Sequence, residues 1–392
     1  MLVTATIKRS TLFRLLCVFI ILGFPRIYGT EVPMAIFIFP LFFHEIIQFF
    51  NRNIRALCFY FLICISWFIY SLVVWFFSSS SILSDFLFFM VLFVKVQLAL
   101  LYGVILYEVI RDKIYLLYIW SSVQICVIVA SFLHKSFYLF MLGFISPRSA
   151  DVFSEIFGLR TIGFGLFHIE GALIFLTSIF VILTLTRYNL MNRLYLLMSF
   201  VVSMTVARSA IIPFIMHSVF SKDLSSKIYL AFIFFVLISL SQIVDSGPLY
   251  EAFEVFRSIA SDSSVNTRST SAVIDMFILP SHAETYIYGD GRFYSDNGLF
   301  YMGTDIGYLR MLYFSGIIGV LFFIVVNTFF LILLFFKRDV NPGYGLRLMA
   351  FVFALVFFIM NAKGIFISLV FNTFIFRMIV EGVSCKVGRS CE

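Results

Sequence analysis

Apolar runs of about twenty residues recur from one end of this chain to the other, for example at 56–77 and 307–336. Lipid offers no hydrogen-bond partner to an unpaired backbone group, so such a run can cross a membrane only as a helix or within a closed barrel. A barrel would need alternating segments of about ten residues, which this sequence lacks. The chain is therefore predicted to be an all-α, polytopic integral membrane protein.

Composition supports the same class and excludes others. Of the 392 residues, 62% are hydrophobic and 12% charged, whereas soluble domains have about 45–50% apolar and about 25% charged residues. The net charge of +7 does not predict nucleic-acid binding, because most Lys and Arg residues occupy short loops between apolar runs, as the positive-inside rule requires. The six Cys residues lack the spacing of metal ligands, so we expect neither a metal nor another cofactor.

The apolar runs and the basic loops between them predict about twelve spans, with the N- and C-termini both cytoplasmic. Two loops, 134–167 and 247–306, are predicted to lie outside the cytoplasm, and residues 1–392 are predicted to form a single transmembrane domain. The predicted spans lie at 10–28, 34–50, 56–77, 85–110, 114–133, 168–186, two short arms within 194–220, 228–246, 307–336, 347–361 and 365–381.

The run at 194–220 decides the sidedness of everything after it. As one span, it would place the basic loop SKDLSSK outside and the long polar segment inside, against the charge rule. As two arms that turn at Ala207-Arg208-Ser209, it restores the alternation. Each arm of about thirteen residues rises only about 20 Å against a core of about 30 Å, so Arg208 is predicted at the floor of an outward-facing, water-filled recess. A single tilted helix with a snorkelling Arg208 is the alternative.

On this topology the outer face collects more basic residues than the charge rule predicts. Arginine's planar fork matches phosphate oxygens, so the excess predicts a site for an anionic lipid headgroup, with diphosphate the most demanding case. The alternative is pairing with a nearby carboxylate, such as Glu254 for Arg257, or Asp290 or Asp296 for Arg292. The residues concerned are Arg160, Arg208, Arg257, Arg268, Arg292, Arg310 and Lys363.

Among the acidic residues of this face, Asp305 is the one that stands at the head of a predicted span. It is a candidate general base for an attacking hydroxyl, and it is equally suited to cap the helix. Gly289, Asp290 and Gly291 predict a tight turn. Lys95, and Glu45 beside His44, are costly within predicted spans and therefore functional candidates, with bundle-stabilising pairs as the alternative, while His282 is predicted to be a loop residue.

Three segments together resemble a known family: FGLRTIGFGLFHIEGA, VARSAIIPF and YGDGRFYSDNGLFYMGTDIGYLRMLYFSGIIGVLFF. The chain resembles the Wzy-type O-antigen and capsule repeat-unit polymerases of bacterial inner membranes and, more distantly, the O-antigen ligases. Ligases typically carry a His-Asn pair where this sequence has Thr304-Asp305, which favours the polymerases. The positions that match the family pattern are Arg208, Arg268, Gly289, Gly291, Asp305, Gly307, Tyr308, Gly316, Gly319 and Lys363.

The resemblance implies a GT-C-like glycosyltransferase, inverting or retaining, that uses neither nucleotide sugar nor metal. It would take a glycan from undecaprenyl diphosphate at the periplasmic face and join it to the non-reducing end of a new lipid-linked repeat unit. Arg160, Arg208, Arg268 and Lys363 are assigned to the diphosphate, with Arg268 and Asp305 as the catalytic residues. Membrane lipid, a chain-length regulator and a flippase are the implied partners. A lipid-linked oligosaccharide flippase or other transporter, a ligase and a structural protein are the rival functions.

Overall fold

The computed structural model is helical, and the described part of the chain contains no strand beyond isolated bridges. The predicted all-α class is therefore confirmed. The structure describes residues 10–155, 157, 160–185, 190–212, 214–215, 224–262, 268–336, 351, 354–367, 371–375 and 377.

Four described helices are long and apolar enough to cross a membrane: α3 (Ile54–Phe77), α4 (Leu83–Ile110), α5 (Tyr115–Leu133) and α16 (Gly307–Phe336). They match the predicted spans at 56–77, 85–110, 114–133 and 307–336 and indicate a membrane protein. Shorter apolar helices lie in α1 (Thr11–Gly23), α8 (His168–Leu185), α9 (Leu190–Val206) and α11 (Leu224–Ser241). The total of about twelve spans remains a prediction, and the predicted spans at 347–361 and 365–381 lie partly outside the described residues.

The predicted span at 34–50 is wrong as a single helix. Its residues form two 3-10 turns, η1 (Met34–Phe37) and η2 (Phe39–Phe42), followed by the ten-residue helix α2 (Phe43–Arg52). Pro40 at the start of η2 has no backbone N–H to continue a helical ladder. Glu45 and His44 lie in the first turn of the ten-residue helix α2, outside the four long apolar helices.

The two predicted outer loops are largely structured. Residues 134–167 contain α6 (Lys135–Leu142), α7 (Pro147–Glu155) and a stretch of extended chain. Residues 247–306 contain α12 (Gly247–Ala252), α13 (Glu254–Asp262), α14 (Arg268–Asp275), α15 (Ala283–Ile287) and the turn η4 (Tyr301–Gly303). Two further 3-10 turns, η3 (Arg208–Ala210) and η5 (Asn361–Lys363), interrupt the apolar runs near their predicted turning points.

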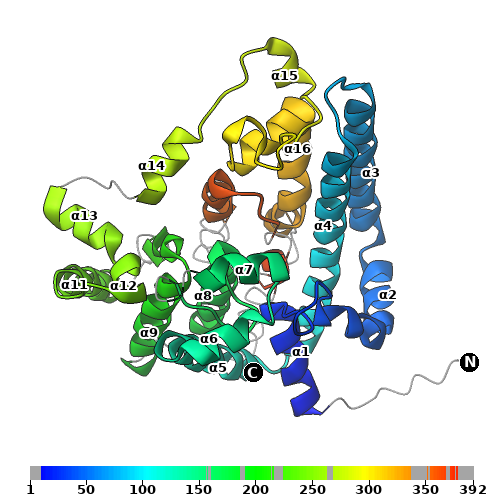
Figure 1. The fold of residues 1–392 in the computed structure, drawn as a ribbon. Coiled ribbons are helices and arrows are strands. Elements are labelled where there is room, and N and C mark those ends of the chain that lie inside the picture. Colours follow the sequence, from blue (N-terminus) through cyan, green and yellow to red (C-terminus); the bar gives the residue numbers. More distant parts are fainter. Residues whose placement is uncertain are drawn as a thin grey trace, which may run out of the picture. The chain divides into compact units, whose positions relative to one another are not determined.

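The chain divides into two compact units, which we describe separately; Figure 1 traces the helices in sequence colours. Unit 1 comprises residues 1–45, 104–210 and 246–251, and unit 2 comprises residues 46–103, 211–245 and 252–392. In unit 1, α5, α8 and α9 pack together, with Trp120 against Phe175 in their core. In unit 2, α3 packs along α16 through Tyr60 and Trp67, both of which are fully buried.

Candidate functional site

The helix α16 is broken near its head, and the break organises the surrounding part of unit 2. Ser315 (φ −140°, ψ 22°) and Gly316 (φ 63°, ψ −171°) leave the helical conformation. Such a break removes the amide donors that the preceding carbonyl groups would otherwise use. Buried carbonyl oxygens at this point therefore need other partners.

The turn at 289–291 supplies those partners. The backbone N–H of Asp290 donates to Tyr313 O (2.6 Å), and that of Gly291 donates to Phe314 O (3.1 Å). From α3, the Tyr70 hydroxyl donates to Ser315 O (3.1 Å). The turn predicted from the GDG sequence is present, and its role is to complete the broken helix.

Both glycines of this turn are required by the geometry. Gly289 has φ +80°, and a Cβ there would lie 2.6 Å from the backbone nitrogens of Ser315 and Gly316. Gly291 has φ +69°, a conformation that L side chains rarely adopt. The backbone of the turn thus lies directly against the helix, with no space for a side chain at position 289.

A buried carboxylate at the head of α4 fixes the chain that follows the turn. Asp85 is fully buried, and its Oδ1 accepts hydrogen bonds from the backbone N–H groups of Phe293 and Tyr294 (both 3.0 Å). Its Oδ2 lies 3.2 Å from Nε of Arg292. Arg292 also binds Asp296 at 2.7 Å, as predicted, but the predicted alternative partner Asp290 is replaced by Asp85. Arg292 is thereby held in a structural role.

Arg310, one turn into α16, lies in a cage of aromatic rings. Its guanidinium carbon is 4.5–5.9 Å from four ring centroids, and the residue is 6% exposed. Cation–π attraction of this kind strengthens when the cation is desolvated. Nη1 of Arg310 points to Asp305, at 3.2 Å from Oδ1. The rings belong to Phe88, Phe293, Tyr294 and Phe300.

Asp305 is therefore held by a cation that cannot move freely. Its side chain is 37% exposed, so one side of the carboxylate remains accessible. Burial raises the pKa of Asp305 above its ordinary value, and the Arg310 guanidinium opposes that rise by favouring the charged form. A carboxylate with a raised pKa is a better proton acceptor than an ordinary one, which is the chemistry predicted for this residue.

The turn that contains Lys363 packs against the same helix head. A Cβ on Gly307 would lie 2.0 Å from Gly364 O, and the Tyr308 hydroxyl donates to Phe358 O (2.9 Å). The backbone next to Lys363 therefore lies close to Gly307, the first residue of α16. Gly307 is two residues after Asp305. Arg268 begins α14 in the same unit, and the side chains of Lys363 and Arg268 lie outside the described residues.

In unit 1, an extended segment at 160–164 is held by polar side chains of neighbouring helices. Gln124 of α5 accepts from the N–H of Phe164 (2.9 Å), and Ser131 donates to Ile162 O (2.9 Å). The N–H of Thr161 donates to Thr205 O (3.1 Å) at the end of α9. These contacts satisfy a non-helical backbone inside protein, the setting in which a membrane protein tolerates one.

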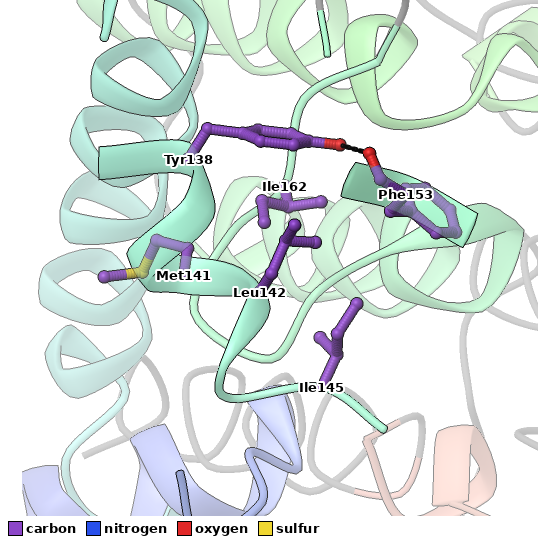
Figure 2. Close-up of a cluster of buried hydrophobic side chains, with 6 residues drawn as sticks. All are labelled: Tyr138, Met141, Leu142, Ile145, Phe153 and Ile162. Carbon is purple, nitrogen blue, oxygen red and sulfur yellow. Dashed lines mark hydrogen bonds between the residues drawn. The ribbon is translucent and has the colours of Figure 1, made fainter. Parts of the chain in front are cut away.

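A buried apolar cluster that includes Ile162 also holds this segment in place. Figure 2 shows its six side chains, which come from α6, the link between α6 and α7, α7 and the extended segment, and the hydrogen bond from the Tyr138 hydroxyl to Phe153 O (2.9 Å). Ile162, fully buried in the cluster, lies two residues after Arg160. Burial of Ile162 therefore restricts the position of the backbone at Arg160. The cluster consists of Tyr138, Met141, Leu142, Ile145, Phe153 and Ile162.

Two arginines meet where α9 ends. The helix stops at Val206 and Arg208 begins η3, so the run at 194–220 is interrupted at the predicted position, and residues 213 and 216–220 of its second half lie outside the described residues. Nη1 of Arg160 donates to Val206 O (3.2 Å), and Nη1 of Arg208 lies 3.6 Å from Glu251 of α12. Burial and then the Arg208 charge lower the pKa of Arg160, while Glu251 acts in the opposite direction. Two guanidinium groups thus interact with one carboxylate, an arrangement suited to binding an anion.

The other candidates are single residues. Lys95 is exposed on α4, and His282 is exposed before α15, as expected of a loop residue. Sequence reasoning missed Glu251, Asp85 and the aromatic cage of Arg310. Asp85 directly follows the SSSSILS loop and opens an apolar helix, which was the available signal for a buried anchor. No protein-family model, curated protein or solved structure matches this chain.

Proposed function

We propose that this protein is a surface-polysaccharide polymerase of the bacterial inner membrane. It joins repeat units carried on undecaprenyl diphosphate, at the periplasmic face, without a nucleotide sugar, a metal or another cofactor. The observation that carries the proposal is the pair Arg160 and Arg208, two electrostatically coupled guanidinium groups beside the carboxylate of Glu251 at the end of α9.

The arginine pair is assigned to the donor diphosphate. When the glycosidic bond to the carrier breaks, negative charge grows on the leaving diphosphate, and fixed cations at that position lower the barrier. The planar guanidinium can bind two phosphate oxygens at once and stays protonated at neutral pH. Arg268 and Lys363, in unit 2, are assigned to a lipid diphosphate on the family resemblance alone, because their side chains lie outside the described residues.

Asp305 is assigned to the acceptor sugar. It removes, or orients, the proton of the attacking hydroxyl, and its raised pKa and partial exposure suit that task. Arg310 holds the carboxylate in place through the 3.2 Å contact. Both substrates carry a lipid anchor, so diffusion in one plane supplies proximity that soluble substrates lack.

The test uses purified protein in proteoliposomes with one defined lipid-linked repeat unit, and it measures the length of the glycan products. We expect a ladder of polymers from the unmodified protein, single units from Arg208→Ala, and shorter or fewer polymers from Arg208→Lys. Arg148→Ala, at an exposed position of α7 in the same unit, should give the full ladder. No ladder from a folded, unmodified protein would refute the proposal.

A deletion strain separates the polymerase from its rivals. Single repeat units transferred to the surface without polymerisation indicate a polymerase. Units trapped on the cytoplasmic face indicate a flippase, and polymer that is made but never attached indicates a ligase.

A further inference from the structure

The part of α16 that follows the break can be compared in length with the hydrocarbon core of a membrane. Twenty of the thirty residues of α16 follow Gly316, and they rise about 30 Å. That length equals the thickness of the hydrocarbon core, about 30 Å. A span that started at the break would therefore be just long enough to cross the core, and the first eight residues of α16 would lie beyond it.

Two segments of the long polar region contact α16 near the break. The Tyr313 hydroxyl donates to Ile278 O (3.1 Å), and a Cβ on Gly316 would lie 2.2 Å from Ile287 O. Val273 and Met276 of the α14 segment and Tyr286 of α15 pack on one buried cluster, and that cluster also contacts Val320, one turn past the break. Both α14 and α15 thus lie against the break.

The opposite side of these segments is apolar and exposed. The exposed fractions are 67% for Ile274, 58% for Phe277 and 52% for Leu279. Ile274 lies in the last turn of α14, and Phe277, Ile278 and Leu279 lie in the non-helical chain that directly follows it. Ile287 and Tyr288 are also exposed, at 47% and 60%.

This apolar surface continues the lipid-facing surface of α3. The Tyr70 hydroxyl of α3 lies 3.4 Å from Ile287 O. On either side of Tyr70 along α3, Ile69 and Val73 are exposed at 53% and 46%. Past the break, Ile317 of α16 is 54% exposed. α3 and α16 are long and apolar enough to cross a membrane, and the exposed side chains of α15 adjoin the exposed side chains of α3.

We propose that residues 274–288 form an interfacial element that lies in the outer leaflet of the bilayer, with Ile274, Phe277, Ile278 and Leu279 among the lipid chains. An amphipathic segment of this kind lies in the plane of the membrane and does not cross it. Tyr288 takes the interfacial position that aromatic residues favour. If the proposed function holds, this interfacial position also places Arg268, at the start of α14, at the level of lipid phosphates.

The experiment measures depth and needs no activity. A nitroxide is attached to Phe277→Cys or Leu279→Cys in a cysteine-free full-length chain, reconstituted in phosphatidylethanolamine and phosphatidylglycerol nanodiscs. His282→Cys is the matched control, because it is exposed in the same segment and polar. Collision rates are measured with oxygen, which concentrates in lipid, and with a water-soluble nickel chelate.

We expect the ratio of oxygen to nickel collisions to be higher at 277 and 279 than at 282. Equal ratios at all three positions would overturn the proposal, since the segment would then lie in water. Low collision rates with both reagents at 277 and 279 would also overturn it and would indicate a protein partner on this face. Where a cysteine variant misfolds, a carbene-bearing lipid on the native chain should label residues 274–279 in preference to 281–285, and the reverse pattern refutes the proposal. A chain that polymerises nothing but gives the expected ratios would refute only the proposed function.

Discussion

Replacing Gly289 by Ala tests whether the glycine turn completes the broken helix. The matched control is Gly298→Ala, in the same segment and also at positive φ (+77° against +80°). A Cβ on Gly298 meets nothing within 4 Å, whereas one on Gly289 meets backbone atoms of α16 at 2.6–2.7 Å. The two variants share the conformational strain and differ in the collision.

The magnitude follows from the contacts that the collision would break. A non-glycine residue at positive φ costs about 1–3 kcal/mol, and that cost is common to both variants. Only Gly289→Ala displaces the turn, which removes the bonds from Asp290 N–H to Tyr313 O and from Gly291 N–H to Phe314 O. Each buried group left without its partner costs about 1–3 kcal/mol. The Gly289 variant is therefore expected to be about 2–5 kcal/mol less stable than the Gly298 variant.

The assay is reversible unfolding of the reconstituted protein in increasing mole fractions of a denaturing detergent, followed by the circular dichroism of the helices. Each variant is compared with the unmodified chain in the same bilayer. Equal losses of unfolding free energy in the two variants would refute the reasoning, because the contact between the turn and α16 would then contribute nothing. A larger loss in the Gly298 variant would refute it as well.

Three further predictions follow from the charged groups. Asp85→Ala removes the acceptor of the Phe293 and Tyr294 N–H groups and one of the two carboxylates beside Arg292. At about 1–3 kcal/mol for each unpaired buried group, it should lower the unfolding free energy by about 2–6 kcal/mol, measured in the same detergent titration; a loss below about 1 kcal/mol would contradict the anchoring role. If Asp305 is the base, polymer synthesis in proteoliposomes should decline as the pH falls through a pKa above the ordinary value of about 4. Removing the opposing charge with Arg310→Met should move that decline to higher pH, and an unchanged pH profile would rule out the coupling. Glu251→Gln removes the carboxylate that competes for the arginine pair and should tighten binding of the lipid-linked diphosphate, measured by calorimetry; weaker binding would contradict the competition.

Hydropathy predicted the long helices well because a span of about twenty apolar residues has few alternatives in lipid. It failed at 34–50, where the run is equally apolar but Pro40 prevents a continuous helix. Hydropathy also predicted residues 134–167 and 247–306 to be loops. Their lower mean hydropathy does not reveal short amphipathic helices such as α14. The α14 segment and α15 are stabilised by packing on the head of α16, and such packing depends on contacts distant in sequence.

The sequence predicted individual positions of the site better than it predicted the contacts between them. The interruption of the helix at Arg208 followed from counting the charges of the loops, and the positive φ angles at 289 and 291 followed from the two glycines. The partner of Arg208 did not, because Glu251 lies more than forty residues away. Likewise, the cage around Arg310 draws Phe88 from α4 and Phe300 from beyond the turn. In a chain with 54 Phe residues, composition cannot single out these rings.

At two helix breaks, one in each unit, backbone contacts join segments that are far apart in the sequence. At the end of α9, Thr205 O and Val206 O have no partner in their own helix, and they accept from Thr161 N–H and Arg160. At the break in α16, Tyr313 O and Phe314 O accept from the turn at 289–291. In each unit, a segment of a predicted outer loop thus completes a helix broken in the same unit. A helix that stops inside the protein needs such a partner, and the short sequence patterns around 160, 208, 290 and 315 are the two halves of these two contacts. Charged side chains carried by the same patterns, Arg160 and Arg208 in unit 1 and Arg292 in unit 2, are held in place by these backbone contacts.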